Sequence, residues 1–162
     1  VLPPENLQFP PLPEWTNPLP KTPPPNPCAG FVPPVAGRDQ NNFGSTTSPP
    51  YSRANPHTGN DYPAQVGTQV VAPLNGRVIT AQPQTNFASV VVASSANGAY
   101  FLVGYLSNLQ VRPGDDLVAG QTVLGQVSRP QGPSTGPHVH FGMFHQYPPW
   151  PMRIPNFFRP CR

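Results

Sequence analysis

The sequence predicts an antiparallel all-β domain flanked by proline-rich, extended termini, and three observations support this fold class. From residue 66 onward, short runs rich in β-branched residues alternate with turn signals. No long segment shows the 3.6-residue period of an amphipathic helix. Many of the 28 prolines crowd the first 34 residues and the last 16. Because proline fixes φ and lacks an N–H donor, those two regions are expected to be extended arms.

Turns that contain Asn-Gly separate the expected strands. The pair Asn75-Gly76 predicts a hairpin, and Asn97-Gly98 predicts a second turn before the run that begins at Tyr100. Ahead of these strands, residues 37–63 form a long loop rich in Asn, Ser, Thr and Pro, which we expect to run into a strand at its end. Further on, strands are expected over residues 69–72, 76–80, 87–93, 100–103, 122–127 and 138–144.

Composition divides the chain into three parts: an arm over residues 1–36, a compact domain over 37–146 and a tail over 147–162. A chain of 162 residues is long enough for one domain with a real core. The arm carries more large apolar side chains than a spacer needs. It is therefore expected to pack either on the domain or on a protein partner, and the sequence leaves both alternatives open.

The charge pattern excludes some classes of partner. The net charge of +3 comes mostly from arginines that are scattered along the chain, whereas a nucleic-acid-binding protein usually shows a clustered basic face. This charge supports only a mild attraction to an anionic surface such as an envelope polymer. No run approaches the ~20 apolar residues of a membrane span.

The start of the chain and its two cysteines bear on the compartment. The chain begins without Met and without the charged and apolar regions of a signal peptide, so it looks processed, and a secreted or periplasmic location is expected. In an oxidising compartment Cys28 and Cys161 would form a disulfide between the two proline-rich ends. Two free thiols are the alternative. A zinc site made of these cysteines is not expected, because the chain contains no CxxC pair.

Three of the four histidines fall in patterns that suit a metal. His138 and His140 are separated by one residue, so in an extended strand both side chains point the same way. His57 is followed four residues later by Asp61. Zinc favours imidazole nitrogen and carboxylate oxygen, and a catalytic zinc site uses three protein ligands with one open position. His57, Asp61 and His140 would form such a set.

These motifs resemble the M23 peptidase family, the lysostaphin-type zinc endopeptidases. The resemblance is carried by HxxxD at 57–61, by GTQVVAPLNGRV at 67–78 and by STGPHVHF at 134–141, and it covers about residues 43–145. An HxxxD motif alone is weak, but its combination with HxH and a matching stretch between them is strong. Residues 111–121 are also similar to biotinyl and lipoyl carrier domains. That reading fails because those domains modify a lysine at a hairpin tip, and the only lysine here is Lys21.

The resemblance implies an antiparallel β core with long loops that form a groove, Zn²⁺ in the floor of that groove, and hydrolysis of peptide bonds in peptidoglycan cross-links. Carried across, the zinc ligands are His57, Asp61 and His140. His138 becomes the catalytic histidine that orients or deprotonates the water that zinc activates. The aromatic residues Tyr51, Tyr62 and Phe43 either line the groove or simply pack.

One position departs from the family pattern. The family usually has a second catalytic histidine in a segment like Ala-His-Leu-Ser, whereas this chain has Tyr105 there. A phenol can donate a hydrogen bond to a developing oxyanion but is a poor base at neutral pH. An alternative function is therefore a catalytically impaired relative that binds wall peptides or a protein partner. In a third alternative the arm, tied by its cysteine, shields the groove.

Overall fold

The computed structural model describes residues 10–13, 15, 26–47, 51–84, 88–130, 136–148 and 156–162. Nine strands and no α-helix occur among these residues, in agreement with the predicted all-β class. The strands are β1 (Asn60–Pro63), β2 (Gln69–Val71), β3 (Gly76–Gln84), β4 (Ala88–Ser95), β5 (Tyr100–Ser107), β6 (Asp116–Leu117), β7 (Val123–Val127), β8 (His138–Phe144) and β9 (Phe157–Phe158).

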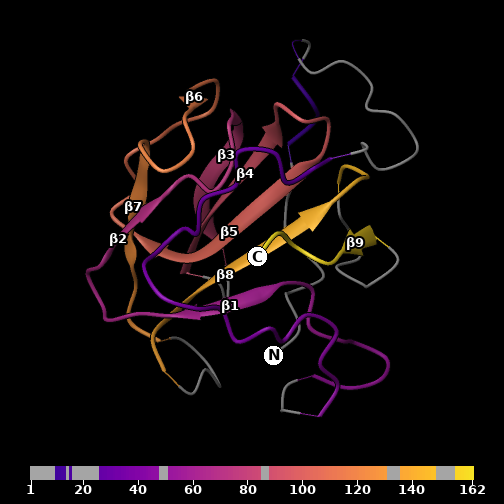
Figure 1. Cartoon of the computed structure of the whole chain (residues 1–162). Coiled ribbons are helices and arrows are strands. Elements are labelled where there is room, and N and C mark those ends of the chain that lie inside the picture. Colours follow the sequence, from indigo (N-terminus) through magenta and orange to yellow (C-terminus); the bar gives the residue numbers. More distant parts are fainter. Residues whose placement is uncertain are drawn as a thin grey trace.

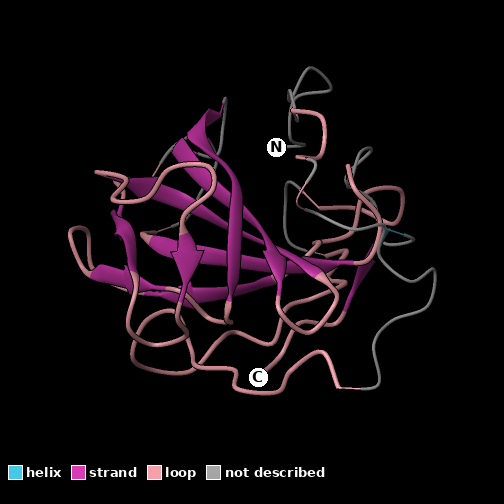
Figure 2. Cartoon of the chain, turned by 90° about the horizontal axis from the view of Figure 1, so that it is seen from above, coloured by secondary structure: helices cyan, strands magenta, loops and turns pink. Residues whose placement is uncertain are grey.

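All strands belong to one antiparallel sheet, whose main path runs β1-β8-β5-β4-β3-β6 (Figure 1). Strand β7 pairs with both β5 and β2, and β9 pairs with β8. The expected hairpin over Asn75-Gly76 is not a two-strand turn, because β3 begins at Gly76 and β2 pairs with β7 instead. Seen from above, the strands form a curved layer, with loops gathered beside it (Figure 2).

An apolar cluster packs on each face of the sheet. One strand contributes to both clusters, because its alternate side chains point to opposite faces. In β4, Val91 and Ala93 belong to the larger apolar cluster, whereas Val90 and Val92 belong to a second, smaller cluster. Strand β8 places Val139, Phe141 and Met143 in the larger cluster. The histidines of β8 therefore point to the opposite face, as the HxH spacing predicts.

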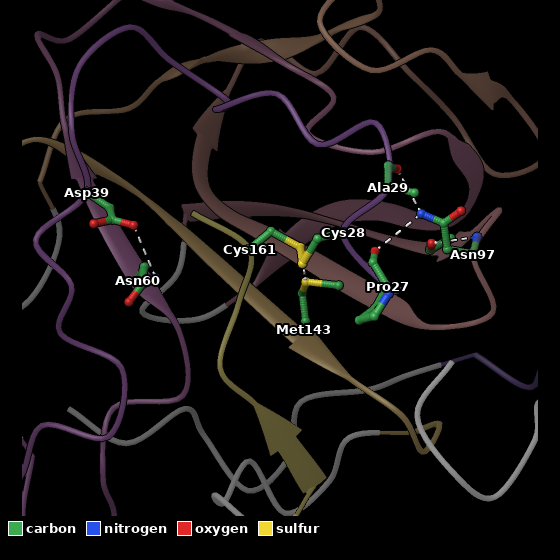
Figure 3. Close-up of a disulfide and its surroundings, with 9 residues drawn as sticks. Pro27, Cys28, Ala29, Asp39, Asn60, Asn97, Met143 and Cys161 are labelled. Atoms are coloured by element: carbon green, nitrogen blue, oxygen red, sulfur yellow. Dashed lines mark hydrogen bonds between the residues drawn. A yellow bond between two sulfur atoms is a disulfide. The ribbon is translucent and has the colours of Figure 1, made fainter. Parts of the chain in front are cut away.

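The two cysteines form a disulfide, which excludes the free-thiol alternative. Cys28 and Cys161 close a loop across a sequence separation of 133 residues. Cys161 is buried against Met143 of β8 (Figure 3). Nearby, the Asn97 side chain donates hydrogen bonds to the carbonyls of Pro27 and Ala29. The part of the arm around Cys28 is thus fastened to the β4–β5 turn.

Parts of the proline-rich ends pack on the sheet. Leu12 packs against the second cluster, and the Tyr147 hydroxyl donates a hydrogen bond to the Pro10 carbonyl. Phe157 of β9 is buried against Phe144. Residues 1–9, 14, 16–25 and 149–155 lie outside the described residues, so the domain boundaries and the shielding role of the arm remain predictions. In the described part of the chain, no helix is long and apolar enough to cross a membrane.

Candidate metal centre

Strands β1 and β8 bring the predicted metal ligands together. Asp61 and His140 are directly opposite partners in the antiparallel β1–β8 ladder, so their side chains lie on the same face. His57 lies in the loop that leads into β1. All three residues are buried, and His57 Nε2 lies 3.1 Å from His140 Nδ1. Asp61 Oδ1 lies 3.3 Å from each of these two nitrogens.

The three donor atoms have the spacing of zinc ligands. A tetrahedral zinc ion with nitrogen and oxygen ligands at about 2.0–2.1 Å places its ligand atoms about 3.3 Å apart. The observed separations of 3.1 and 3.3 Å match this requirement. Asp61 Oδ1 is buried and makes no regular hydrogen bond with any described residue. The residues therefore fit a Zn²⁺ ion.

Hydrogen bonding and burial favour the protonation states that a metal needs. The Nδ1 atom of His57 lies 3.0 Å from the Asn42 carbonyl oxygen, so Nδ1 carries the proton and Nε2 presents a lone pair to the cluster. Burial lowers the pKa of His140. Burial alone would raise the pKa of Asp61, but its contacts with His140 and His57 outweigh this effect and hold that pKa below its ordinary value. Metals bind neutral imidazole and ionised carboxylate.

Gly59 allows the ligand loop to approach β8 closely. A Cβ atom at this position would lie 2.3 Å from the Phe141 carbonyl oxygen and 2.8 Å from His140 Nε2. Both distances are below any real contact of a Cβ atom, and the first involves backbone that cannot move aside. The glycine between the two ligands of the HxxxD motif is thus a requirement of packing.

His138 lies beside the three ligands rather than among them. Its Nε2 atom is 3.7 Å from Asp61 Oδ1, and its side chain is 17% exposed, in contrast to the 2% of His140. The Nδ1 atom lies 2.9 Å from the Gly136 carbonyl oxygen, so the proton sits on Nδ1 and Nε2 faces the cluster. This orientation suits an imidazole that exchanges a proton with a group held at the cluster.

Tyr105 stands next to His138 in a strained backbone conformation. The two ring centroids are 4.5 Å apart. Tyr105 has φ of 65°, which non-glycine residues rarely adopt. Opposite this point the β4–β5 register is irregular, with both Ala88 and Ser89 facing Leu106. Burial, together with the charge of Asp61, raises the pKa of the Tyr105 phenol to about 12.

Of the three aromatics that the sequence offered for the groove, Tyr51 is the one that lies beside a residue of the cluster. Its ring centroid is 4.5 Å from that of His57, and burial followed by the negative charge of Asp61 raises its pKa. Tyr62 and Phe43, which were considered with it, instead pack in the larger and the second cluster respectively. In the sequence all three aromatics fall in the loop expected over residues 37–63, so their spacing does not show which of them lies at the site.

A cavity of about 690 Å³ lies beside the end of β5, the strand that carries Tyr105. Leu106 and Ser107, the two residues after Tyr105, line it, whereas Tyr105, His138 and the three cluster residues do not. Among the described residues, its polar lining consists of hydroxyl and amide side chains with one cation, Arg129, and no carboxylate. The lining residues come from β3, β4, β5 and β7 and from the segments that follow β1, β5 and β7.

Comparison with known proteins agrees with this geometry. Residues 55–150 match the model of peptidase family M23. Over 85 residues, the chain is 36% identical to the DD-carboxypeptidase/endopeptidase Mpg of Neisseria meningitidis, and the Neisseria gonorrhoeae protein gives the same match. The matched region is 52% of this chain but only 19% of that relative.

Solved structures share the fold. The catalytic domain of the prophage-encoded M23 protein EnpA from Enterococcus faecalis, solved as a mutant, superposes with a TM-score of 0.61 at 26% identity. That match covers 80% of this chain and 94% of the other. The catalytic domain of lysostaphin from Staphylococcus simulans has a TM-score of 0.58 at 24% identity, covering 66% and 79% of the two chains. At that identity the lysostaphin match supports the fold alone.

Proposed function

Since the chain belongs to peptidase family M23, we propose that it is a zinc-dependent endopeptidase that hydrolyses peptide bonds in peptidoglycan cross-links. The observation that carries the proposal is the buried triangle of His57 Nε2, Asp61 Oδ1 and His140 Nδ1 at zinc-ligand spacing. The disulfide supports a secreted or periplasmic location, because disulfides persist in oxidising compartments.

His57, Asp61 and His140 hold the zinc ion in this proposal. Zinc in such a site supplies a Lewis acid that polarises a carbonyl and lowers the pKa of water to about 7. The scissile peptide bond lies on the side of the triangle that His138 faces. The neighbouring cavity accepts the adjoining part of the peptide, whose polar groups meet hydroxyl and amide side chains there.

His138 accepts the proton of the attacking water. Its Nδ1 atom lies 2.9 Å from the Gly136 carbonyl oxygen, and its Nε2 atom faces the triangle, 3.7 Å from Asp61 Oδ1. After the attack, the same nitrogen donates this proton to the departing amine, which completes the cleavage without a second base.

Tyr105 acts as a hydrogen-bond donor to the oxygen that becomes negative in the transition state. A phenol whose pKa is about 12 stays protonated at neutral pH, so it donates and does not accept a proton. Tyr105 takes the place of the family's second histidine in this role. The contact of its ring with His138 also fixes the plane of that imidazole.

The test is digestion of purified peptidoglycan by the zinc-loaded protein. New peptide termini are quantified by labelling of free amines and by mass spectrometry. We expect release by the wild-type protein, and no release above background by His138→Ala at the same zinc content. If the wild-type protein matches the His138→Ala control, it is not a hydrolase of this substrate.

A second function, the binding of wall peptides or of a protein partner without cleavage, is favoured by Tyr105. A site with zinc and a groove but without the family's second histidine would retain binding. The discriminating variant is Tyr105→His, assayed beside the wild-type protein. A gain of hydrolysis from an inactive wild-type protein, with unchanged zinc content, would favour the binding function over the enzyme.

A further inference from the structure

The segment 39–45 runs along the two ligands of the HxxxD motif and is tied to them by backbone hydrogen bonds. The Gln40 amide donates to the Asp61 carbonyl at 2.8 Å. The Gly44 amide donates to the His57 carbonyl at 2.8 Å, and the His57 amide donates to Ser45 at 3.0 Å. This pairing places one residue of the segment, Asn42, between the side chains of the two ligands.

Asn42 contacts both ligands through three separate groups. Its backbone carbonyl lies 3.0 Å from His57 Nδ1. Its side-chain nitrogen donates to Asp61 Oδ2 at 3.0 Å, and its side-chain oxygen accepts a hydrogen bond from the Asp61 amide at 3.0 Å. The carboxamide carries a donor and an acceptor on one short side chain, so Asn42 makes both contacts with Asp61 at once. Asn42 is not itself a ligand, because its side-chain oxygen is already engaged.

We propose that Asn42 is a positioning residue of the metal centre, which holds His57 in the tautomer and Asp61 in the rotation that binding requires. By occupying Oδ2 of Asp61, it turns Oδ1 toward the two imidazoles. By accepting the Nδ1 proton of His57, it leaves Nε2 unprotonated. The inference rests on the zinc site of the proposed function and assigns the residue that prepares that site for the ion.

Residues close to the C-terminus support Asn42 from outside. Arg162 contacts both carboxylate oxygens of Asp39 at 3.1–3.2 Å, and the Asp39 side chain is only 4% exposed. Asp39 in turn accepts a hydrogen bond from the Asn60 side chain (Figure 3). The Arg159 guanidinium lies 5.4 Å from the centre of the Phe43 ring. Asn42 therefore sits in a segment held on both sides, and its side chain is set before any ion arrives.

The competing explanation is that Asn42 only fastens a loop. Removing it would then lower the stability of the fold and leave the affinity for zinc unchanged. Partners that orient metal ligands typically contribute about 10–100-fold to metal affinity. The two explanations thus differ in a quantity that can be measured without any turnover.

The experiment compares Asn42→Ala and Asn42→Asp with a matched control, Asn97→Asp. Asn42→Ala removes both side-chain hydrogen bonds to Asp61, together with a longer one of 3.4 Å to the Gln40 side chain. Asn42→Asp keeps the acceptor but replaces the donor with a second carboxylate oxygen facing Asp61 Oδ2. Asn97 is similarly half-buried and donates to two carbonyls at 3.3 and 2.9 Å, far along the sheet from the metal centre, so its variant loses the same kind of donor.

Zinc affinity of each protein is measured by competition with a chromophoric chelator. The d–d absorption of the Co²⁺-substituted protein reports the ligand geometry. We expect affinity about 10-fold weaker for Asn42→Ala and weaker still for Asn42→Asp, with altered Co²⁺ spectra. Asn97→Asp is expected to lower the melting temperature and to keep wild-type affinity and spectrum.

Wild-type affinity and an unchanged Co²⁺ spectrum in either folded Asn42 variant would overturn the inference, as would an equal loss of affinity in Asn97→Asp. The melting temperature identifies an Asn42 variant that has not folded. In that case the other Asn42 variant decides between the two explanations. A wild-type protein that binds zinc but releases no peptides refutes the proposed function and leaves this inference standing. A wild-type protein that binds no zinc overturns both.

Discussion

At the scale of single residues, Tyr105 is the most unusual feature of the site. A non-glycine residue at φ of 65° costs roughly 1–2 kcal/mol relative to ordinary conformations. Such strain persists where the surrounding structure imposes it, and it gathers at functional sites. Here it occurs beside the register irregularity opposite Leu106, and the phenol ring lies against His138. The strained backbone thus sets the place of the hydroxyl.

The hydroxyl of Tyr105 can be removed without changing its backbone. We expect Tyr105→Phe to lower the rate of peptide hydrolysis about 10²-fold, because one donor to the developing oxyanion is lost. Zinc content should not change, since Tyr105 is not a ligand. The measurement is the initial rate of amine release at equal zinc occupancy. A variant with the wild-type rate would show that the phenol has no part in the chemistry.

At the scale of elements, the site depends on how closely the loop before β1 approaches β8. The antiparallel register places Asp61 opposite His140, and Gly59 lets the chain between the two loop ligands pass directly over β8. The geometry of the site is therefore a property of two elements and their contact, and it does not belong to any single motif.

Substitution of Gly59 tests this contact. Gly59→Ala would place a Cβ atom 2.3 Å from backbone, so the loop must move away from β8. We expect at least a 10-fold loss of zinc affinity, comparable to the loss of an orienting partner, together with a lower melting temperature. Chelator competition measures the first, and a thermal scan measures the second.

Gly114→Ala is the control for that experiment. At φ of 92° an alanine there strains the backbone, but its Cβ meets no atom within 4 Å and it lies in a distant turn, so the control perturbs the fold without the steric clash of Gly59→Ala. It should lower the melting temperature and leave zinc affinity unchanged. Equal zinc affinities in the two alanine variants would contradict the role given to Gly59.

The sequence predicted the parts of the fold and site that follow from local periodicity. The period of two along β8 placed His138 and His140 on one face, and β-branched runs marked the central strands. The position of Asn42 beside the two ligands was not predictable, because the conformation of its segment depends on Arg159 and Arg162 from the other end of the chain. Strand β9 is two residues long in a proline-rich tail, too short for any pattern.

At the scale of the whole molecule, two devices join distant parts of the chain. The disulfide joins Cys28 to Cys161, and the metal centre joins the loop before β1 to β8. The disulfide restricts the unfolded chain, and zinc bound at the metal centre favours the folded chain. Each therefore contributes to stability independently of the core. Their effects can be separated, because reductants act on one and chelators on the other.

Removal of the disulfide should destabilise the protein. For a closed loop of 133 residues, the chain-entropy model gives about 5 kcal/mol, and measured losses are usually about 2–5 kcal/mol. We expect Cys28→Ser/Cys161→Ser to melt roughly 5–15 °C below the wild-type protein. A reductant should lower the wild-type melting temperature to that of the double variant and have no effect on the variant itself. A reductant-sensitive variant would contradict the assignment.

Removal of zinc should lower stability by a separate amount. Zinc at 100 times its dissociation constant stabilises the folded state by about 2.7 kcal/mol. A chelator should therefore lower the melting temperature by roughly 5–10 °C in the wild-type protein. His57→Ala, which lacks a ligand, should show no response to the same chelator. Equal responses in the two proteins would show that the effect does not arise from this site.

The bridge between Cys28 and Cys161 also governs how the protein must be prepared. Expression in a reducing cytosol would yield two thiols, and Arg162, the neighbour of Cys161, would lose the anchor that keeps it near Asp39. Kinetics recorded on such a batch would describe a loosened molecule. Periplasmic expression or oxidative refolding, verified by the loss of two hydrogens from the intact mass, should therefore precede any assay.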